Sequence, residues 1–438
     1  MLTTLKNAFK IEQIRSKLFY TFLMLVVIRI GSQLPVPGVD RSYFANWFAS
    51  QTNNAFGFFD AITGGSFESM SLLALGISPY ITSSIVMQLL TIAIPKLEEM
   101  QKDGEDGKKK IAAISRYLSV GLALFQSSFM AIGLGNQGLL VEYNAINIIT
   151  AIVALTAGSA FLMWIGERIT EKGVGNGISI VLVINILSRI PQDLARLFEQ
   201  FVVGKPFATA ALAAVVIIAV IILMVVLVIL LNGGVRKIPV QYAKKMQGSR
   251  QMVGGQMSSI PLKVNTAGVI PIIFASSIMQ LPIIICSFIK TSDTGVWAEI
   301  LKGLDSNNWC KPSAPIYSIG LLVYILLVVF FAYFYTSVTF NPLMVADNMK
   351  KQGGFIPGVR PGKPTSDYLQ KVLNYIIFIG AIGLTVIGIL PFIFNGIFGA
   401  TISFGGTSLI IIVSVILETI KQIEAQMKVR NYKGFLNE

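Results

Sequence analysis

The sequence predicts an all-helical integral membrane protein with ten spans. Three observations support this fold class: an apolar composition, ten stretches of apolar residues, and a one-sided distribution of basic residues. Apolar residues (AVILMFWYC) make up 54% of the 438 positions, and charged residues only 13%. A soluble domain carries about 25% charged residues, so most of this chain has no water-facing surface.

Ten stretches approach the roughly 20 apolar residues that cross a bilayer. They run over residues 18–34, 72–94, 111–134, 146–165, 178–190, 209–231, 264–288, 316–338, 368–394 and 404–423. The sixth is the most continuous. Arg29 interrupts the first, and the fifth is short and contains Asn185. The basic, amphipathic start of the chain is not followed by a small-residue cleavage site, so we do not expect a cleaved signal peptide.

The basic residues orient these spans. With the N-terminus in the cytosol, 27 of the 35 Lys and Arg residues fall in cytosolic segments, seven in external segments, and Arg29 within a span. A missing or extra span would scramble this asymmetry, so we predict that both termini are cytosolic. The net charge of +13 is then mainly a topology signal.

Ten spans divide into five plus five at an external connection. We predict an N-terminal half over residues 1–191, an external hinge connection over 192–208, a C-terminal half over 209–423 and a cytosolic tail over 424–438. An odd number of spans per half reverses the orientation of the second half, which predicts inverted repeats with a site at their interface.

Three connecting segments are longer than simple connections require. Cytosolic loops 232–263 and 339–367 are basic and rich in turn residues, and long loops in compact proteins usually carry a function. The external stretch 35–70 contains FGFFDAITGGSFESMS, which is too short to span. This segment is either re-entrant or an interfacial helix lying on the membrane.

The function class follows from what the spans hold. The sequence has no His, only two Cys, and no GxSxG, HExxH or Walker motif, so we expect no enzyme, no cofactor and no metal site. Polar residues within the spans are mostly uncharged, whereas ion-coupled transporters place ionisable groups there. Arg29, Glu167 and Glu418 are near span ends, where snorkelling explains them. The scarcity of ionisable groups within the spans argues against an ion-coupled pump. A secondary transporter for a small solute is kept as the alternative to the function that the strings described next imply.

Several long strings resemble the SecY family of protein-conducting channels. SLLALGISPYITSSIVMQLL and WIGERITEKGVGNGISIVL resemble its signature stretches. Further similar segments are RKIPVQYAKKMQGSR, SSIPLKVNTAGVIPIIFASSI, FNPLMVADNMKKQGGFIPGVRPGKPTSDYL and FGGTSLIIIVSVILE. The resemblance runs from the N-terminus to the tail. It implies a ten-helix clamshell of two inverted halves, with an hourglass pore and a re-entrant plug helix between them.

The resemblance also implies three sets of residues in and around the pore. The predicted ring, an apolar constriction, consists of Ile81, Ile85, Leu182, Ile186, Ile273 and Ile411; the family pattern has Ile at the place of Leu182. The predicted plug consists of Asp60, Ala61, Ile62, Thr63, Gly64, Gly65, Ser66, Phe67, Glu68 and Ser69. The predicted lateral gate includes Gln88, Gln126, Ser127, Ser276, Ser277 and Gln280. Within the ring, the two pairs on one helix have i,i+4 spacing, which places each pair on one helix face.

The predicted docking residues are on the two long cytosolic loops. They are Arg236, Lys244, Lys245, Arg250 and Arg360. The resemblance implies that they meet ribosomal RNA phosphates or the SecA motor ATPase. It further implies small SecE- and SecG-like membrane subunits, signal sequences and unfolded polypeptides as substrates, contact with membrane lipid, and location in the bacterial cytoplasmic membrane. The ribosome or SecA would supply the energy for this passive pore.

Overall fold

A computed structural model describes residues 9–50, 60, 62–242, 245–246, 252–253, 257–288, 295–311, 314–398 and 406–434. The first part of the chain is built from helices α2 (Glu12–Gly31), α3 (Arg41–Ser50), α5 (Ser78–Ala93), α6 (Pro95–Lys102), α7 (Glu105–Leu134), the π-helical turn η1 (Gly135–Leu139), α8 (Ala145–Lys172) and α9 (Gly177–Phe201).

The second part adds a small amount of strand. It contains α10 (Phe207–Gly233), β1 (Val235–Tyr242), β2 (Lys245–Met246), β3 (Met252–Val253), β4 (Met257–Lys263), α11 (Ile270–Phe288), α12 (Val296–Leu304), the short 3-10 helices η2 (Ser306–Asn308) and η3 (Pro315–Ser318), α13 (Ile319–Thr339), α14 (Pro342–Lys351), β5 (Gly354–Phe355), α15 (Lys363–Phe398) and α16 (Gly406–Gly434).

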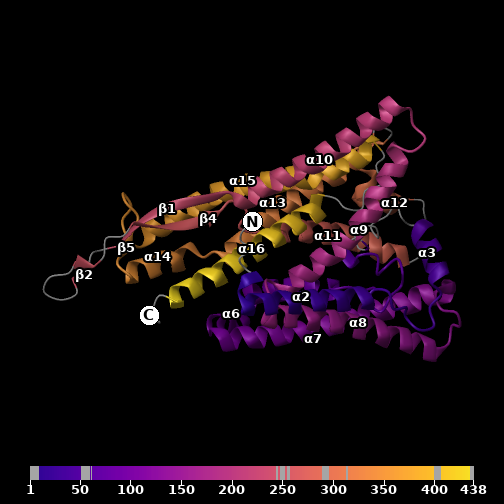
Figure 1. Ribbon diagram of the computed structural model, residues 1–438, viewed down its shortest axis with the longest axis horizontal. Coiled ribbons are helices and arrows are strands. Elements are labelled where there is room, and N and C mark those ends of the chain that lie inside the picture. Colours follow the sequence, from indigo (N-terminus) through magenta and orange to yellow (C-terminus); the bar gives the residue numbers. More distant parts are fainter. Residues whose placement is uncertain are drawn as a thin grey trace.

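The long helices form two groups (Figure 1). Helices α2, α7 and α8 lie together in the lower part of the view, and α10, α13 and α15 lie in the upper part. Within the first group α8 packs against α2, α7 and α9, and within the second α13 packs against α11 and α15. Helix α16 lies between the groups and contacts α9, α10 and α15. The last helix of the chain therefore joins the two groups.

A helix covers the main part of each of the ten predicted spans, but several bounds differ. The seventh span is helical only from Ile270, for example, and the helix of the tenth continues to Gly434. The second span begins late, because residues 72–77 form turns and α5 starts only at Ser78. The fifth is longer than predicted, because α9 continues through Pro191 to Phe201. The connection predicted over residues 192–208 is therefore largely helical. Pro191 removes one backbone hydrogen bond and its ring crowds the carbonyl four residues earlier, but the helix continues on both sides of it.

Length and composition alone identify fewer spans than the sequence pattern does. Among the described residues, five helices are long and apolar enough to cross a membrane, or six if α5 and α6 count as one span despite the 107° bend between them. In α11 the apolar part that is identified covers only Ile270–Met279. The number ten rests on the pattern of spans and charges and stays a prediction.

The GVGNG segment between α8 and α9 is a tight turn in which each residue type is needed. Gly175 has φ +79°, a left-handed conformation that favours glycine. Asn176 caps α9, since its side chain accepts hydrogen bonds from the backbone N–H groups of Ile178 and Ser179. The N–H of Gly177 donates to Thr170 Oγ1 at 2.8 Å. This turn sets the direction in which α9 enters the centre of the molecule.

The two long loops that are predicted to be cytosolic fold into one body rather than two separate connections. Strand β1 pairs with β4 along its whole length and with β5 at its end, which gives the order β4-β1-β5. Residues from both loops and from α15 share a buried cluster: Ile238, Val240, Leu262, Met349, Ile356, Leu369, Val372 and Ile376. Strands β1 and β4 lie on the left of Figure 1, above α14. The basic loops are thus held on a packed base.

A close approach of backbone to backbone fixes α8 beside the segment that precedes α5. A Cβ atom added at Gly158 would overlap the carbonyl oxygen of Leu72, whereas one added at Gly121 on α7 would meet nothing within 4 Å. Small residues allow such approaches between membrane helices. We therefore expect Gly158→Ala to lower the stability by about 1–3 kcal/mol through overpacking.

The measurement is the thermal unfolding midpoint of the purified protein in detergent. Gly121→Ala is the matched control, and it should leave the midpoint unchanged or raise it slightly, since Ala favours helix over Gly. Equal midpoints for the two variants would contradict the proposed contact.

Candidate functional site

Five of the six predicted ring side chains lie in a single cluster at the centre of the molecule. Leu182, Ile186 and Ile411 are buried members of it, and Ile81 and Ile273 are partly buried and pack against it. They come from α5, α9, α11 and α16, which are distant in the sequence. The structure thus brings side chains from four helices together into one apolar cluster.

Ile85, the sixth predicted ring residue, packs elsewhere. It is partly buried against a second cluster that contains Phe274, Tyr324 and Phe331 of α11 and α13. Ile81 and Ile85 are one helical turn apart on α5, so α5 contacts both clusters along the same face. The side chain of Ile85 therefore contacts the C-terminal group of helices rather than the central cluster.

The predicted plug packs against the central cluster. Ile62 is itself a member of that cluster, and Asp60 and Thr63 are buried at 0% and 1% exposure. Phe67 points the other way and makes an edge-to-face contact with Phe44, with ring centroids 5.3 Å apart. Residues 62–63 are helical and turns follow to residue 70. Ala61 lies outside the described residues.

Helix α9 holds this segment through a polar face. Gly64 has φ +70°, and a Cβ there would come within 2.6 Å of the carbonyl oxygen of Asn185, so only glycine permits the approach. Ser188 Oγ donates to the Gly64 carbonyl oxygen at 3.3 Å. Arg189 Nη1 forms an ion pair with Asp60 Oδ2 and lies 2.8 Å from Glu68 Oε2.

Sequence reasoning missed these polar residues. Arg189 was counted among the external basic residues, but its side chain is only 3% exposed. Arg29 was expected to snorkel to the interface; instead its Nη2 donates to Asn185 Oδ1 at 2.5 Å. A signal was present, because Asn185, Ser188 and Arg189 have the i,i+3,i+4 spacing of one helix face and charges within spans usually have partners.

The predicted gate residues are divided between different surroundings. Gln88 is partly buried on α5 and Gln126 on α7; on α11, Ser277 is exposed and Ser276 is buried. Ser127 faces away from α11 and α13, because its Oγ lies 2.9 Å from Thr156 Oγ1 on α8. The side chain of Gln280 lies outside the described part of the chain.

Two of the predicted docking residues can be placed on the body that the two long basic loops form. Arg236 is exposed on β1, opposite Leu262 of β4. Arg360 is exposed on the turn before α15, where its carbonyl oxygen accepts a hydrogen bond from Thr365 Oγ1 at 2.8 Å. Lys244 and Arg250 lie outside the described residues, and of Lys245 only the backbone in β2 is described.

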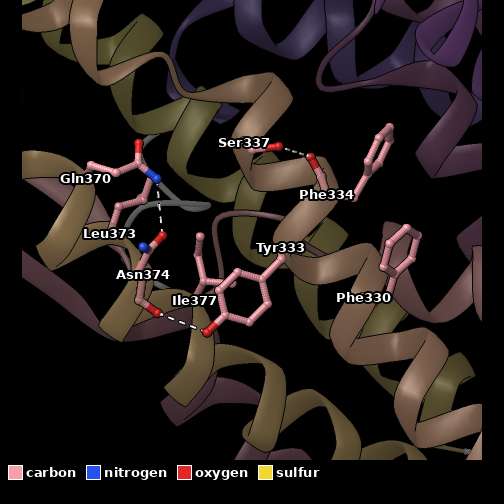
Figure 2. A pocket seen from close by; sticks show the side chains of 8 residues that line it. All are labelled: Phe330, Tyr333, Phe334, Ser337, Gln370, Leu373, Asn374 and Ile377. Atoms are coloured by element: carbon pink, nitrogen blue, oxygen red, sulfur yellow. Dashed lines mark hydrogen bonds between the residues drawn. The ribbon is translucent and has the colours of Figure 1, made fainter. Parts of the chain in front are cut away.

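A groove of about 310 Å³ lies between α13 and α15, away from the ring and the plug. Figure 2 shows its lining of aromatic and amide side chains, where Tyr333 Oη donates to the Asn374 carbonyl oxygen at 3.3 Å and Gln370 Nε2 donates to Asn374 Oδ1 at 3.2 Å. None of its lining residues belongs to the predicted ring, plug or gate. Within the described residues, no three His, Cys, Asp or Glu side chains gather in the way that a metal site requires.

Comparison with known proteins identifies the family. The SecY family model matches residues 71–420. A relative from Streptomyces galbus, described as protein translocase subunit SecY, is 42% identical over 452 residues, which covers all of both chains. A relative from Halalkalibacterium halodurans with the same description is also 42% identical, over 443 residues and all of both chains.

A solved structure gives independent support for the fold. That structure is of a SecY protein, and its description says that the plug domain stabilises the closed state of the translocation channel and maintains a membrane seal. It has a TM-score of 0.62 and 19% identity, and the match covers 94% of this chain and 92% of that one. The predicted fold class, an all-helical multi-pass membrane protein, is therefore confirmed. On these grounds the chain belongs to the SecY family of protein-conducting channel subunits.

Proposed function

We propose that the structure is the idle state of this channel, sealed at the predicted ring by apolar side chains and on the external side by the predicted plug. The observation that carries the proposal is the shared cluster, in which Ile62 of the plug packs with ring residues of four helices. An unfolded polypeptide would cross where these side chains meet. The pore is a non-enzymatic conduit, and its energy would come from the ribosome or the SecA ATPase.

An apolar ring suits a pore that must be wide when it works and closed to ions when idle. Hydrophobic constrictions close by dewetting, without any charged group. Leu182, Ile186 and Ile411 are each less than 10% exposed, so they leave little room for water. The same side chains have no fixed hydrogen-bond pattern and would fit around chains of any sequence.

The seam between α5–α7 and α11–α13 is the proposed lateral gate. Helices α5 and α7 pack against each other, and so do α11 and α13, so that each pair can move as a unit. The polar side chains of Gln88, Gln126 and Ser277 would prevent the two pairs of helices from packing together as tightly as apolar surfaces do, so that the seam could open. A passing segment would then enter lipid according to its partition energy, about −0.3 to −0.6 kcal/mol for each Leu, Ile, Phe or Val and +2.5 to +3.5 for a central charge.

The cytosolic body formed by the two basic loops is the proposed docking platform. Arg236 and Arg360 project from a base that the cluster around Ile238 and Leu369 holds rigid, which favours a defined contact over a diffuse one. One solved structure similar to this chain is described as Sec61 in a canine ribosome-channel complex from the endoplasmic reticulum, with a TM-score of 0.57 and 17% identity, and covers 94% of this chain and 93% of that one. We propose ribosomal RNA phosphates and SecA as the partners of this platform, and SecE- and SecG-like subunits within the membrane.

We propose the cytoplasmic membrane as the location of this protein, which the bacterial origin of its relatives supports. The proposed orientation puts both termini and the docking platform in the cytosol, and the plug and α12 on the outside. This assignment follows from the positive-inside rule.

Reconstitution into lipid vesicles tests the proposed function. With its small partner subunits, the protein should import a secretory precursor only when SecA and ATP are present. A secondary transporter would instead take up a small solute along an ion gradient. Solute uptake without precursor import would contradict the proposal.

The ring makes a prediction about leakage. Replacing Ile411 by Ser should let water enter the constriction, so that idle reconstituted channels conduct ions several-fold more and accept precursors with defective signal sequences. Ile416→Ser on the same helix is the matched control, since Ile416 is 43% exposed and lies outside the cluster. Unchanged conductance for Ile411→Ser in a planar bilayer would contradict the ring assignment.

The platform predicts a charge-dependent docking step. Arg360→Glu should cripple precursor translocation in inverted membrane vesicles and leave membrane insertion of the protein intact. Docking to RNA phosphates would also weaken steeply as salt rises. Lys205→Glu, which reverses an exposed charge on the external side, is the control and should translocate normally. Normal translocation by Arg360→Glu would refute the docking role.

A further inference from the structure

We infer that Arg189 is a positioning residue of the closed channel, one that holds the plug against α9 by bridging the carboxylates of Asp60 and Glu68. The inference rests on the proposed role of residues 60–69 as the plug. It goes beyond that role because it assigns the holding force to one cation on a pore-lining helix, in addition to the apolar contacts of the ring.

The geometry brings the three charges together across a long sequence distance. Arg189 Nη1 contacts Asp60 Oδ2 and lies 2.8 Å from Glu68 Oε2, so one nitrogen serves both ends of the plug. Asp60 Oδ1 meanwhile accepts a hydrogen bond from the backbone N–H of Glu68 at 2.8 Å. The two acids are thereby linked to each other as well as to α9, and the plug is held as a closed loop.

Burial makes Asp60 depend on this cation. The side chains of Asp60 and Arg189 are 0% and 3% exposed, and that of Glu68 is 34% exposed. A buried carboxylate without a partner is strongly destabilising, whereas a paired one is tolerated. Asp193, one turn further along α9, is also fully buried, which adds to the local need for a positive charge. Removing Arg189 should therefore expel Asp60, and the plug with it, toward water.

The same pair suits a plug that must also leave. In the dry closed state the attraction between the charges is strong, because it scales inversely with the local dielectric constant. When a polypeptide opens the ring and water enters, both the attraction and the cost of exposing the charges fall. The contact is thus firm when the channel is idle and weak once the channel is wet, which apolar packing alone would not provide.

The helix places this contact next to the ring. Two i,i+4 pairs lie on neighbouring faces of α9. One is the ring pair Leu182 and Ile186, and the other is the pair that contacts the plug, Asn185 and Arg189. Gly64 lies against Asn185 and fixes the distance of closest approach. A movement of α9 that widens the ring therefore also moves Arg189 relative to the plug.

The test measures how often the plug leaves its place in the idle channel. Ser66 is 2% exposed, so Ser66→Cys reports exposure of the plug to a membrane-impermeant maleimide added from the external side. The measurement uses the complete translocase in vesicles, with Cys286→Ser and Cys310→Ser to remove the native thiols. Adding Arg189→Gln should raise the labelling rate of Cys at position 66 at least tenfold. Arg196→Gln, which removes an exposed cation from the same helix, should not change it.

Two further variants separate a charge effect from general damage. Arg189→Lys keeps the cation and should label within a few-fold of the parent. Asp60→Asn combined with Arg189→Gln removes the buried carboxylate of Asp60 together with the cation that it pairs with, so the double variant should label more slowly than Arg189→Gln alone, as expected of directly coupled residues. Equal rates for the Lys and Gln variants, or additive effects of the two neutral substitutions, would overturn the inference.

The same cysteine distinguishes failure of this inference from failure of the plug assignment. If residues 60–69 are the plug, an arrested precursor should raise labelling at position 66 in the parent channel, whatever Arg189 does. Increased labelling with precursor but none with Arg189→Gln would overturn the role of Arg189 alone. No increase with precursor would overturn the plug assignment, and with it the inference.

Discussion

Exclusion of water is the constraint on which the closed channel depends. We propose that the central cluster seals the pore, because Leu182, Ile186, Ile411 and Ile62 all belong to it and each is less than 10% exposed. The ion pair of Arg189 with Asp60 lies just beyond this cluster and draws its strength from the same dryness. Apolar packing and buried charge are usually opposed in a protein interior. In the proposed closed state both are stabilising, and the ion pair is the part that weakens when water enters the pore.

Helix α9 organises this arrangement, and its neighbours fix its position. The GVGNG turn sets its start, with Asn176 as the cap, and α8 and α16 pack along it. Helix α16 also contacts α10 and α15. A change in the spacing of the two helix groups should therefore move α9 as well. The ring, the plug contact and the connection between the groups therefore meet on one element.

Local patterns in the sequence were enough to predict a helix at each span, and longer strings were enough to identify the family. The ring residues followed from the family resemblance, and five of the six belong to or pack against the central cluster. A helix covers the main part of every predicted span, because apolar runs and charge asymmetry are local signals. The pairing of Arg189 with Asp60 was missed because it joins residues 129 positions apart, and no local pattern reports such contacts. The β4-β1-β5 sheet was missed for the same reason, since it joins two loops that are separated by α11 and α13. Ser127 was grouped by residue type, but its partner Thr156 places it on another helix face.

The most direct test of the account is whether the plug rests on α9 in the idle channel and must leave for transport. Ser188 contacts the plug at Gly64, so Ser188→Cys with Ser66→Cys places two thiols across the contact for a short bifunctional maleimide. We predict that they cross-link in idle membranes, do not cross-link when an arrested precursor fills the pore, and block translocation once cross-linked. Normal translocation through the cross-linked channel would contradict the central claim.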